Sequence, residues 1–281
     1  MGNHKRAGFT IIETTLFLGI SSFLIVALIA STGNSVNIQR YNDAVQTFKA
    51  TLQQQYADVA SVQNARDNNW TCDSGTLPTK TGTVSDNRGQ SKCILVGKYV
   101  RLENEKISIY KVVAYDKDTF SRSDDVLSLK NNYRLSVLRD AGDVEQTTLE
   151  WGAKISYPRT QGGAANTAFA KPQNPRKLGM LVIRSPDSGQ IYTFSNSDDE
   201  VPDDANINPA ELAKVIVAGG FTSGEAQGAR WICINSDGLL VNNSTAIQIN
   251  AYASSASAIE TQTNEFMNTA SPTTATLGFK C

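Results

Sequence analysis

The chain has 281 residues with 26 Lys or Arg and 27 Asp or Glu, which gives a formal net charge of −1. This balance leaves no basic footprint for nucleic acid or acidic membrane surfaces, and the length allows one large domain or two modest ones. The single histidine, His4, lies near the N-terminus, so the rest of the chain cannot build a Ser-His-Asp or Cys-His catalytic arrangement. We therefore expect no enzyme and no cofactor.

A short basic leader precedes a long apolar stretch at the N-terminus. Residues 4–6 are His-Lys-Arg, Gly8 follows, and residues 9–30 are apolar except for the single charge of Glu13 and a few hydroxyl side chains. About 20 apolar residues cross a bilayer core as a helix, so we predict a membrane-spanning segment over 9–30 with the leader on the cytoplasmic side. An ionised Glu in hydrocarbon is costly and usually has a partner. A plain single-pass anchor, with Glu13 reaching toward the headgroups, is the alternative.

The N-terminal stretch resembles the class III signal of type IV prepilins and type II secretion pseudopilins. The matching residues are Lys5, Arg6, Gly8, Phe9, Thr10, Ile11, Ile12 and Glu13. The resemblance implies that a prepilin peptidase cuts between Gly8 and Phe9 and that the new N-terminal Phe9 is methylated. It also implies that Glu13 pairs with the terminal amine of a neighbouring subunit during filament assembly. Loss of the leader would leave 24 basic and 27 acidic residues, a net charge of −3.

The predicted helix continues beyond the membrane segment as an amphipathic half. Apolar residues recur at steps of three and four, which is the spacing of one helical face: Tyr41, Val45, Phe48, Leu52, Tyr56 and Val59. No proline occurs before Pro78, so we expect one helix over residues 9–66, roughly 85 Å long. Its second half should pack on the C-terminal domain and leave the first half to other copies.

Four cysteines follow the apolar stretch: Cys72, Cys93, Cys233 and Cys281. An even number in an oxidising compartment predicts two disulfides, for which three pairings are possible. We favour Cys72–Cys93 and Cys233–Cys281, because each pair lies in one neighbourhood of the sequence. Zinc is the rival ligand, but no CxxC spacing is present.

Residues 67–281 are predicted to form a β-rich extracytoplasmic domain, which makes the fold α+β. Strand-like segments separated by turn residues indicate an antiparallel sheet or sandwich: 92–102, 106–115, 133–138, 147–157, 180–184, 190–194, 230–235 and 239–241. One short helix should begin at the cap Asn208, with Pro209 first and Glu211 completing the cap. The tail over residues 250–280 is rich in Ser, Thr and Ala and is expected to be flexible.

The order of cysteine, strand and later hairpin resembles the GspH/FimT-like minor pilins, whose implied fold is the type IV pilin fold with a sandwich after the long helix. The segment 116–204 makes the chain longer than a simple pilin and is interpreted as an insert.

Two clusters of charge are candidate binding sites. Carboxylates between residues 198 and 204 are a candidate for Ca²⁺, although a solvated acidic loop is the preferred interpretation: Asp198, Asp199, Glu200, Asp203 and Asp204. Basic and aromatic residues on the first predicted hairpin are a candidate DNA-contact face, with ordinary solvated strand faces as the alternative: Lys92, Lys98, Tyr99, Arg101, Lys106, Tyr110 and Lys111.

The resemblance implies a minor or major subunit of a surface filament used for adhesion, twitching motility or DNA uptake. The alternatives are a type II secretion pseudopilin and a pilus-tip adhesin or DNA-binding receptor. The expected partners are other pilin subunits, prepilin peptidase, an inner-membrane assembly platform with its ATPase, and membrane lipid before assembly. The expected location is the cytoplasmic membrane, with the N-terminus inside, and then the cell-surface pilus.

Overall fold

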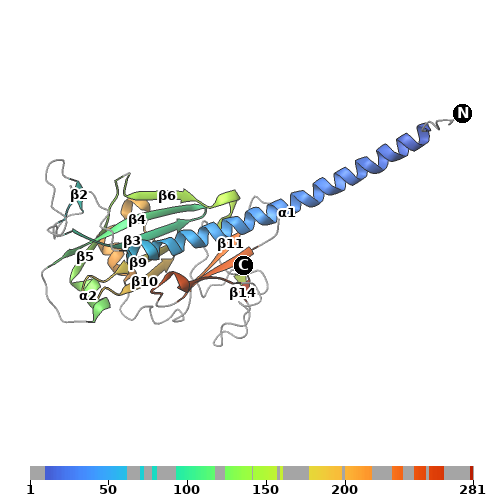
Figure 1. Ribbon diagram of the computed structural model, residues 1–281. Helices are drawn as coiled ribbons and strands as arrows, with labels where there is room; N and C mark the ends of the chain where they lie inside the picture. Colours follow the sequence, from blue (N-terminus) through green and yellow to red (C-terminus); the bar gives the residue numbers. More distant parts are fainter. Residues whose placement is uncertain are drawn as a thin grey trace, which may run out of the picture.

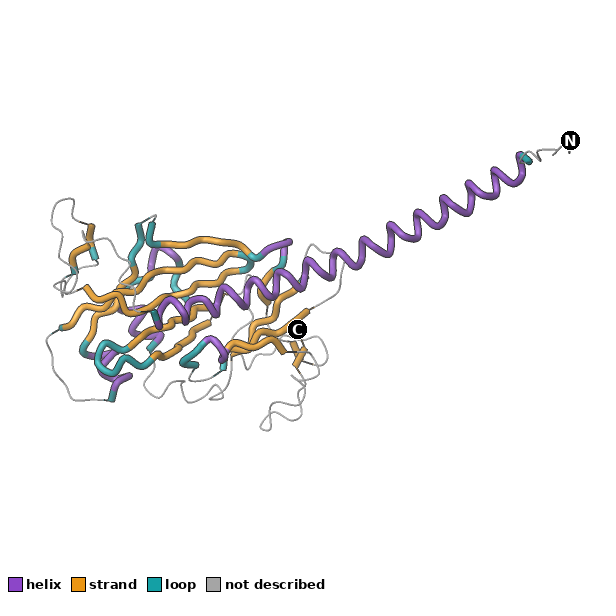
Figure 2. The backbone as a smooth tube through the Cα atoms, in the orientation of Figure 1, coloured by secondary structure: helices purple, strands orange, loops and turns teal. Residues whose placement is uncertain are grey.

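The computed structural model describes residues 10–61, 70–72, 78–80, 93–117, 124–140, 142–156, 159–160, 177–197, 200–216, 230–236, 244–250, 253–262 and 279–280. One long helix, α1, runs from the N-terminal end into a β-rich domain and leaves more than half of its length projecting from it (Figure 1). Figure 2 shows the second half of this helix lying along the strands of the domain. The fold is therefore α+β, as predicted.

Helix α1 spans Ile11–Ala60 without a break and is about 75 Å long at 1.5 Å per residue. The six apolar residues predicted for its inner face, Tyr41 to Val59, are all buried, so the periodicity identified the packed half correctly. The helix ends at Ala60, earlier than the predicted Arg66. The leader and Phe9 lie outside the described residues.

The main sheet is antiparallel and has the strand order β10-β9-β3-β4-β5, with β6 sharing the edge of β4. Its strands are β3 (Cys93–Glu103), β4 (Lys106–Asp116), β5 (Tyr133–Val137), β6 (Val144–Thr148), β9 (Lys177–Arg184) and β10 (Ile191–Ser197). The predicted turn between β3 and β4 is confirmed, and its Asn104 adopts a left-handed φ of 55°, which Asn tolerates better than most residues.

A second antiparallel sheet has the order β13-β12-β11-β7. Its strands are β7 (Lys154–Ser156), β11 (Arg230–Asn235), β12 (Ser244–Ile249) and β13 (Ile259–Gln262). Two short pairs complete the described strands: β1 (Trp70–Thr71) with β2 (Thr79–Lys80), and β8 (Arg159–Thr160) with β14 (Phe279–Lys280).

Buried apolar side chains lie on both faces of the main sheet. On one face, Val100 and Ile109 pack with the α1 stripe and with Ile234 of the second sheet. On the other face, Tyr99 packs with residues of helices α2 (Asp125–Asn131) and α3 (Pro209–Val215). Because side chains alternate along a strand, Tyr99 and Arg101 project away from α1, whereas Lys98 and Val100 project toward it.

Several predicted elements need correction. The segment 147–157 is not one strand, because Trp151 and Gly152 take left-handed φ values of 57° and 71° and separate β6 from β7. The segment 116–204, interpreted as an insert, is an integral part of the main sheet, since it supplies β9, which pairs directly with β3. The predicted strand 239–241 lies outside the described residues, and the described hairpin partner of β11 is β12.

Helix α3 begins as predicted, because the Asn208 side chain accepts hydrogen bonds from the backbone N–H groups of Ala210 and Glu211. The Glu211 carboxylate instead pairs with Lys214 at 2.7 Å, so its predicted capping role is wrong. Helix α2 was not predicted, although Asp124 caps it through Leu127 N at 2.8 Å.

The Cys72–Cys93 disulfide is confirmed, with Cα atoms 5.4 Å apart. Cys233 is also disulfide-bonded, and its predicted partner Cys281 lies outside the described residues, as does most of the tail after residue 262.

Candidate functional site

The first half of α1 is an exposed apolar surface. Large apolar side chains between Ile11 and Ile38 face outward, with Ile11 83% and Phe23 74% exposed. The helix is long and apolar enough to cross a membrane, and the apolar window of residues is not buried by the domain. Exposed apolar patches of this size mark surfaces that contact lipid or other proteins.

Hydroxyl groups within this surface are hydrogen-bonded to the helix itself. Thr14 Oγ1 donates to Ile11 O at 2.9 Å, and Thr32 Oγ1 donates to Leu28 O at 3.0 Å. Such bonds satisfy the polar groups internally, as hydrocarbon requires. These polar side chains therefore do not oppose burial of the surface.

Glu13 closes the N-terminus of α1 in a capping box with Thr10. Its carboxylate oxygen Oε2 accepts from Thr10 N at 3.1 Å and from Thr10 Oγ1 at 3.2 Å, while Glu13 N donates to Thr10 Oγ1 at 3.3 Å. The sequence carries the signal for this cap, Thr followed three residues later by Glu, but the two roles predicted for Glu13 were pairing with a neighbouring subunit and contact with the headgroups. The predicted cleavage residues Gly8 and Phe9 lie outside the described part of the chain.

The second half of α1 is fastened to the domain by polar contacts as well as by its apolar stripe. Tyr41 Oη donates to Ile234 O at 2.8 Å, and Tyr56 Oη hydrogen-bonds Thr193 Oγ1 at 2.9 Å. Burial raises the pKa of Tyr56 to about 12, so this bond is kept across the physiological range. Because α1 is one continuous helix, these contacts of its second half with the domain also fix the direction in which its exposed first half projects.

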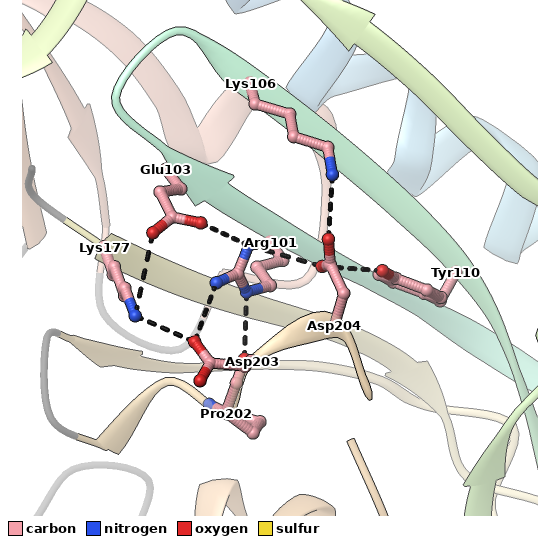
Figure 3. Close-up of polar contacts among 8 residues, drawn as sticks. All are labelled: Arg101, Glu103, Lys106, Tyr110, Lys177, Pro202, Asp203 and Asp204. Carbon is pink, nitrogen blue, oxygen red and sulfur yellow. Dashed lines mark hydrogen bonds and ion pairs between the residues drawn. The ribbon is translucent and has the colours of Figure 1, made fainter. Parts of the chain in front are cut away.

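The candidate acidic and basic clusters meet in one ion-pair network (Figure 3). Arg101, which is 3% exposed, lies 2.8 Å from Glu103 and 3.3 Å from Asp204, and its Nε donates to Pro202 O at 2.9 Å. Its second terminal nitrogen lies 3.4 Å from Asp203. The main sheet therefore holds the 203–204 turn through one buried guanidinium.

Two lysines and a tyrosine complete this network. Lys106 and Tyr110 donate to Asp204 at 2.8 and 2.7 Å, and Lys177 donates to Asp203 at 2.9 Å. Burial works against ionisation of Asp204, but the bonds from Lys106 and Tyr110 and the charge of Arg101 lower its pKa. The hydrogen bond from Lys177 lowers the pKa of Asp203.

These contacts change both candidate binding sites. Asp203 and Asp204 are ion-paired to three cations, Arg101, Lys106 and Lys177, although the Asp203 side chain remains 64% exposed to solvent. Among the described residues, no group of acidic, His or Cys side chains is arranged to hold a metal. Asp198 and Asp199 lie outside the described residues, and no ion pair within the described part of the chain involves the Glu200 side chain.

The candidate DNA-contact face is not an open basic surface. Lys98 pairs with Asp58 and Glu145, each at 3.3 Å, and Lys111 pairs with Asp143 at 2.8 Å. Both tyrosines are buried: Tyr99 and Tyr110. Lys92 lies outside the described residues. The described cations of this hairpin are therefore neutralised by the chain's own carboxylates.

A cavity of about 260 Å³ lies between α2, β5 and α3. Its lining includes the cationic residues Lys117, Lys130 and Arg134 and the apolar residues Leu129 and Leu135. Burial and the charge of Arg134 lower the pKa of Lys117. Figure 1 shows α2 and β5 at the end of the domain away from the exposed half of α1. The three cations in its lining would favour an anionic group over a cationic one.

Comparison of the chain with protein families, with curated proteins and with solved structures finds no match in any of the three. The geometry of α1 and of the domain therefore carries the functional conclusion.

Proposed function

We propose that this chain is a membrane-anchored prepilin that is cleaved after Gly8 and assembles through α1 as a minor subunit of a type IV pilus or a related filament. Its role is structural and interactive rather than enzymatic. Before assembly, the exposed half of α1 lies in the cytoplasmic membrane with the domain outside, and the assembly platform then moves it into the filament.

One observation carries the proposal: a single uninterrupted helix is buried in the domain along one half and exposes an apolar surface along the other half. Residues Tyr41–Val59 bury an apolar face in the domain, whereas Ile11–Ile38 present large apolar side chains outward. A plain anchor needs only a spanning segment and has no use for a rigid extension from the domain core. Packing such rods side by side would cover the exposed surface without unfolding any part of the domain.

Glu13 supports the same proposal through its position. It is the single acidic residue in the exposed half of α1, and a charge in an apolar bundle gains from an opposite charge on a neighbour. Its bonds to Thr10 stabilise the start of the helix. Pairing with the methylated amine of an adjacent Phe9 would add charge complementarity to that local cap.

Two variants of Glu13 separate capping from charge. Glu13→Gln keeps an oxygen that can accept from Thr10 and removes the charge, whereas Glu13→Ala removes both. We expect both variants to be cleaved and inserted but to be lost from sheared surface filaments, as measured by mass spectrometry. Incorporation of Glu13→Gln at the wild-type level would show that charge pairing is not required.

Processing is tested on the same filaments. We expect a peptide that begins with N-methylated Phe9, and a mature chain that still carries Met1–Gly8 would refute the proposal. A type II secretion pseudopilin would give the same peptide, so a deletion strain is needed to separate the two systems. Loss of twitching or attachment supports a pilus, and loss of protein secretion alone supports a pseudopilin.

A ligand-binding role at the filament tip is a second candidate, favoured by the cavity between α2, β5 and α3. The probe is butyrate, which combines a carboxylate with a short apolar chain, titrated into the full chain in detergent and followed by NMR. We expect shifts confined to the cavity that Lys130→Gln reduces and Lys214→Gln leaves unchanged. Absence of saturable shifts in the wild-type protein would remove this candidate.

A further inference from the structure

A strained and exposed tryptophan occupies the corner between β6 and β7. Trp151 lies in the short 3-10 turn Glu150–Gly152, its φ is 57°, and its side chain is 49% exposed. Among the described residues outside α1, the large apolar side chains that are exposed are Trp151 and Ile94. A bulky residue at positive φ costs about 1–3 kcal/mol, and such strain concentrates at functional positions.

The backbone on both sides of Trp151 fixes this exposure. Leu149 N donates to Glu105 O at 2.7 Å, and Ile155 N donates to Asn104 O at 2.9 Å. Leu149, Ala153 and Ile155 are buried, so the corner is held to the β3–β4 turn from both ends. The outward direction of the indole is therefore imposed by a packed frame.

The indole is covered on one side by a cation from α1. The guanidinium carbon of Arg40 lies 4.7 Å from the centroid of the Trp151 ring, within the range of cation–π attraction. Arg40 directly precedes Tyr41, the first residue of the buried stripe. The pair thus lies where α1 leaves the domain, and Figure 1 shows this as the end of the domain facing the projecting helix.

The distance along α1 places this pair on the outer side of the predicted membrane span. Arg40 is the first charged residue after Glu13, and residues 14–39 form an uncharged segment of 26 residues. Arg40 lies ten residues beyond residue 30, the end of the predicted span, which is about 15 Å along the helix at 1.5 Å per residue and therefore on the outer side of the membrane. Arginine side chains on a helix also tilt toward its N-terminus, which here is toward the membrane.

We propose that Trp151 and Arg40 together contact the phosphate and glycerol layer of the outer leaflet while α1 spans the membrane. The inference rests on the membrane anchor of the proposed function. Tryptophan prefers this layer because its ring is apolar and its N–H is a donor, and a guanidinium matches phosphate. Glu150 and Asp43 are nearby in the sequence and exposed. Their negative charges would repel anionic headgroups, so we expect a zwitterionic lipid to be sufficient for the contact.

The test uses the full chain reconstituted in phosphatidylcholine vesicles that carry bromine either near the glycerol end or near the tip of the acyl chains. Tryptophan fluorescence of the wild type is compared with that of Trp151→Phe, so that the difference isolates Trp151 from Trp70 and Trp231. We expect bromine near the glycerol end to quench the fluorescence of Trp151 more than bromine near the tip of the acyl chains. Trp70→Phe is the control, because Trp70 is buried and its removal should leave the quenching amplitude unchanged.

Arg40→Gln provides a second variant, and we expect it to weaken the shallow quenching of Trp151. Quenching that is equal in the wild type and in Trp151→Phe would overturn the inference. A crosslink between Trp151 and a second copy of the chain, together with loss of quenching by bromine, would also overturn it. Flotation of the same vesicles separates the two proposals. A chain that does not float with them refutes the membrane anchor itself, whereas a chain that floats without quenching refutes only the contact of Trp151 and Arg40.

Discussion

Replacement of Arg101 by leucine tests the ion-pair network most directly. The guanidinium is almost fully buried and lies within 3.4 Å of carboxylates from Glu103, Asp203 and Asp204. Leucine preserves part of the apolar stem but removes the one cation among the described residues that contacts all three carboxylates. The remaining carboxylates would then repel one another next to the sheet.

The expected cost follows from how buried the partners are. Breaking a fully buried pair by removing one member costs about 3–5 kcal/mol. Asp203 is 64% exposed in its side chain and keeps Lys177, and Asp204 keeps Lys106. Solvent and these lysines screen the orphaned charges, so we expect a smaller loss of unfolding free energy of about 2–3 kcal/mol at neutral pH.

The measurement is urea unfolding of the full chain in detergent, followed by near-ultraviolet circular dichroism. Lys214→Met is the matched control, because Lys214 is 70% exposed and pairs with Glu211 on the surface of α3, so a change of about 0.5 kcal/mol or less is expected. The difference between Arg101→Leu and wild type should shrink in acid, where the carboxylates are protonated. An unfolding free energy for Arg101→Leu equal to that of the control would refute the assigned role of the network.

Three further predictions concern stability in the same assay. Phe48→Ala should lower the unfolding free energy by about 3–5 kcal/mol, because Phe48 is buried in the α1 stripe and its removal leaves a cavity; a loss below that of Arg101→Leu would contradict this packing. The pKa values of Asp203 and Asp204 are lowered from 3.8, so their contribution is complete above that pH and disappears as the pH falls through their folded values. Wild-type stability should therefore drop below about pH 4, more steeply than that of an Asp203→Asn, Asp204→Asn variant. Removal of the Cys72–Cys93 disulfide by a double serine substitution should cost about 3 kcal/mol for its 21-residue separation, which equal midpoints with and without reductant in the wild type would disprove.

Local patterns predicted the elements whose structure depends on near neighbours. The α1 stripe from Tyr41 to Val59 follows from a helical period against one core, and the start of α3 follows from Asn208 and Pro209. The hairpin of β3 and β4 follows from two β-rich runs around Asn104. In each case the residues that decide the structure lie within a few positions of one another, so the sequence alone carries the information.

Long-range contacts account for most of what the sequence did not predict. Arg101 meets Asp203 across 102 positions, and no local pattern relates a strand cation to a later loop. Trp151 takes its left-handed conformation because bonds to Asn104 and Glu105 fix the flanking residues, which a strand-like composition conceals. The Thr10–Glu13 cap is different, because its motif is local and visible in the sequence. It was not predicted, because the charge of Glu13 was assigned to a contact with a neighbouring subunit.

The arrangement of the buried half of α1 has a mechanical consequence. Tyr41 and Val59 are 18 residues apart, so the length of α1 that is packed against the domain is about 27 Å. A pull along the helix axis would have to draw six apolar side chains out of the domain together, each costing about 1.5–3 kcal/mol to expose. The tension is then distributed over all six side chains at once and does not break their contacts one residue at a time. A domain attached to such a helix would therefore resist being pulled off it under load.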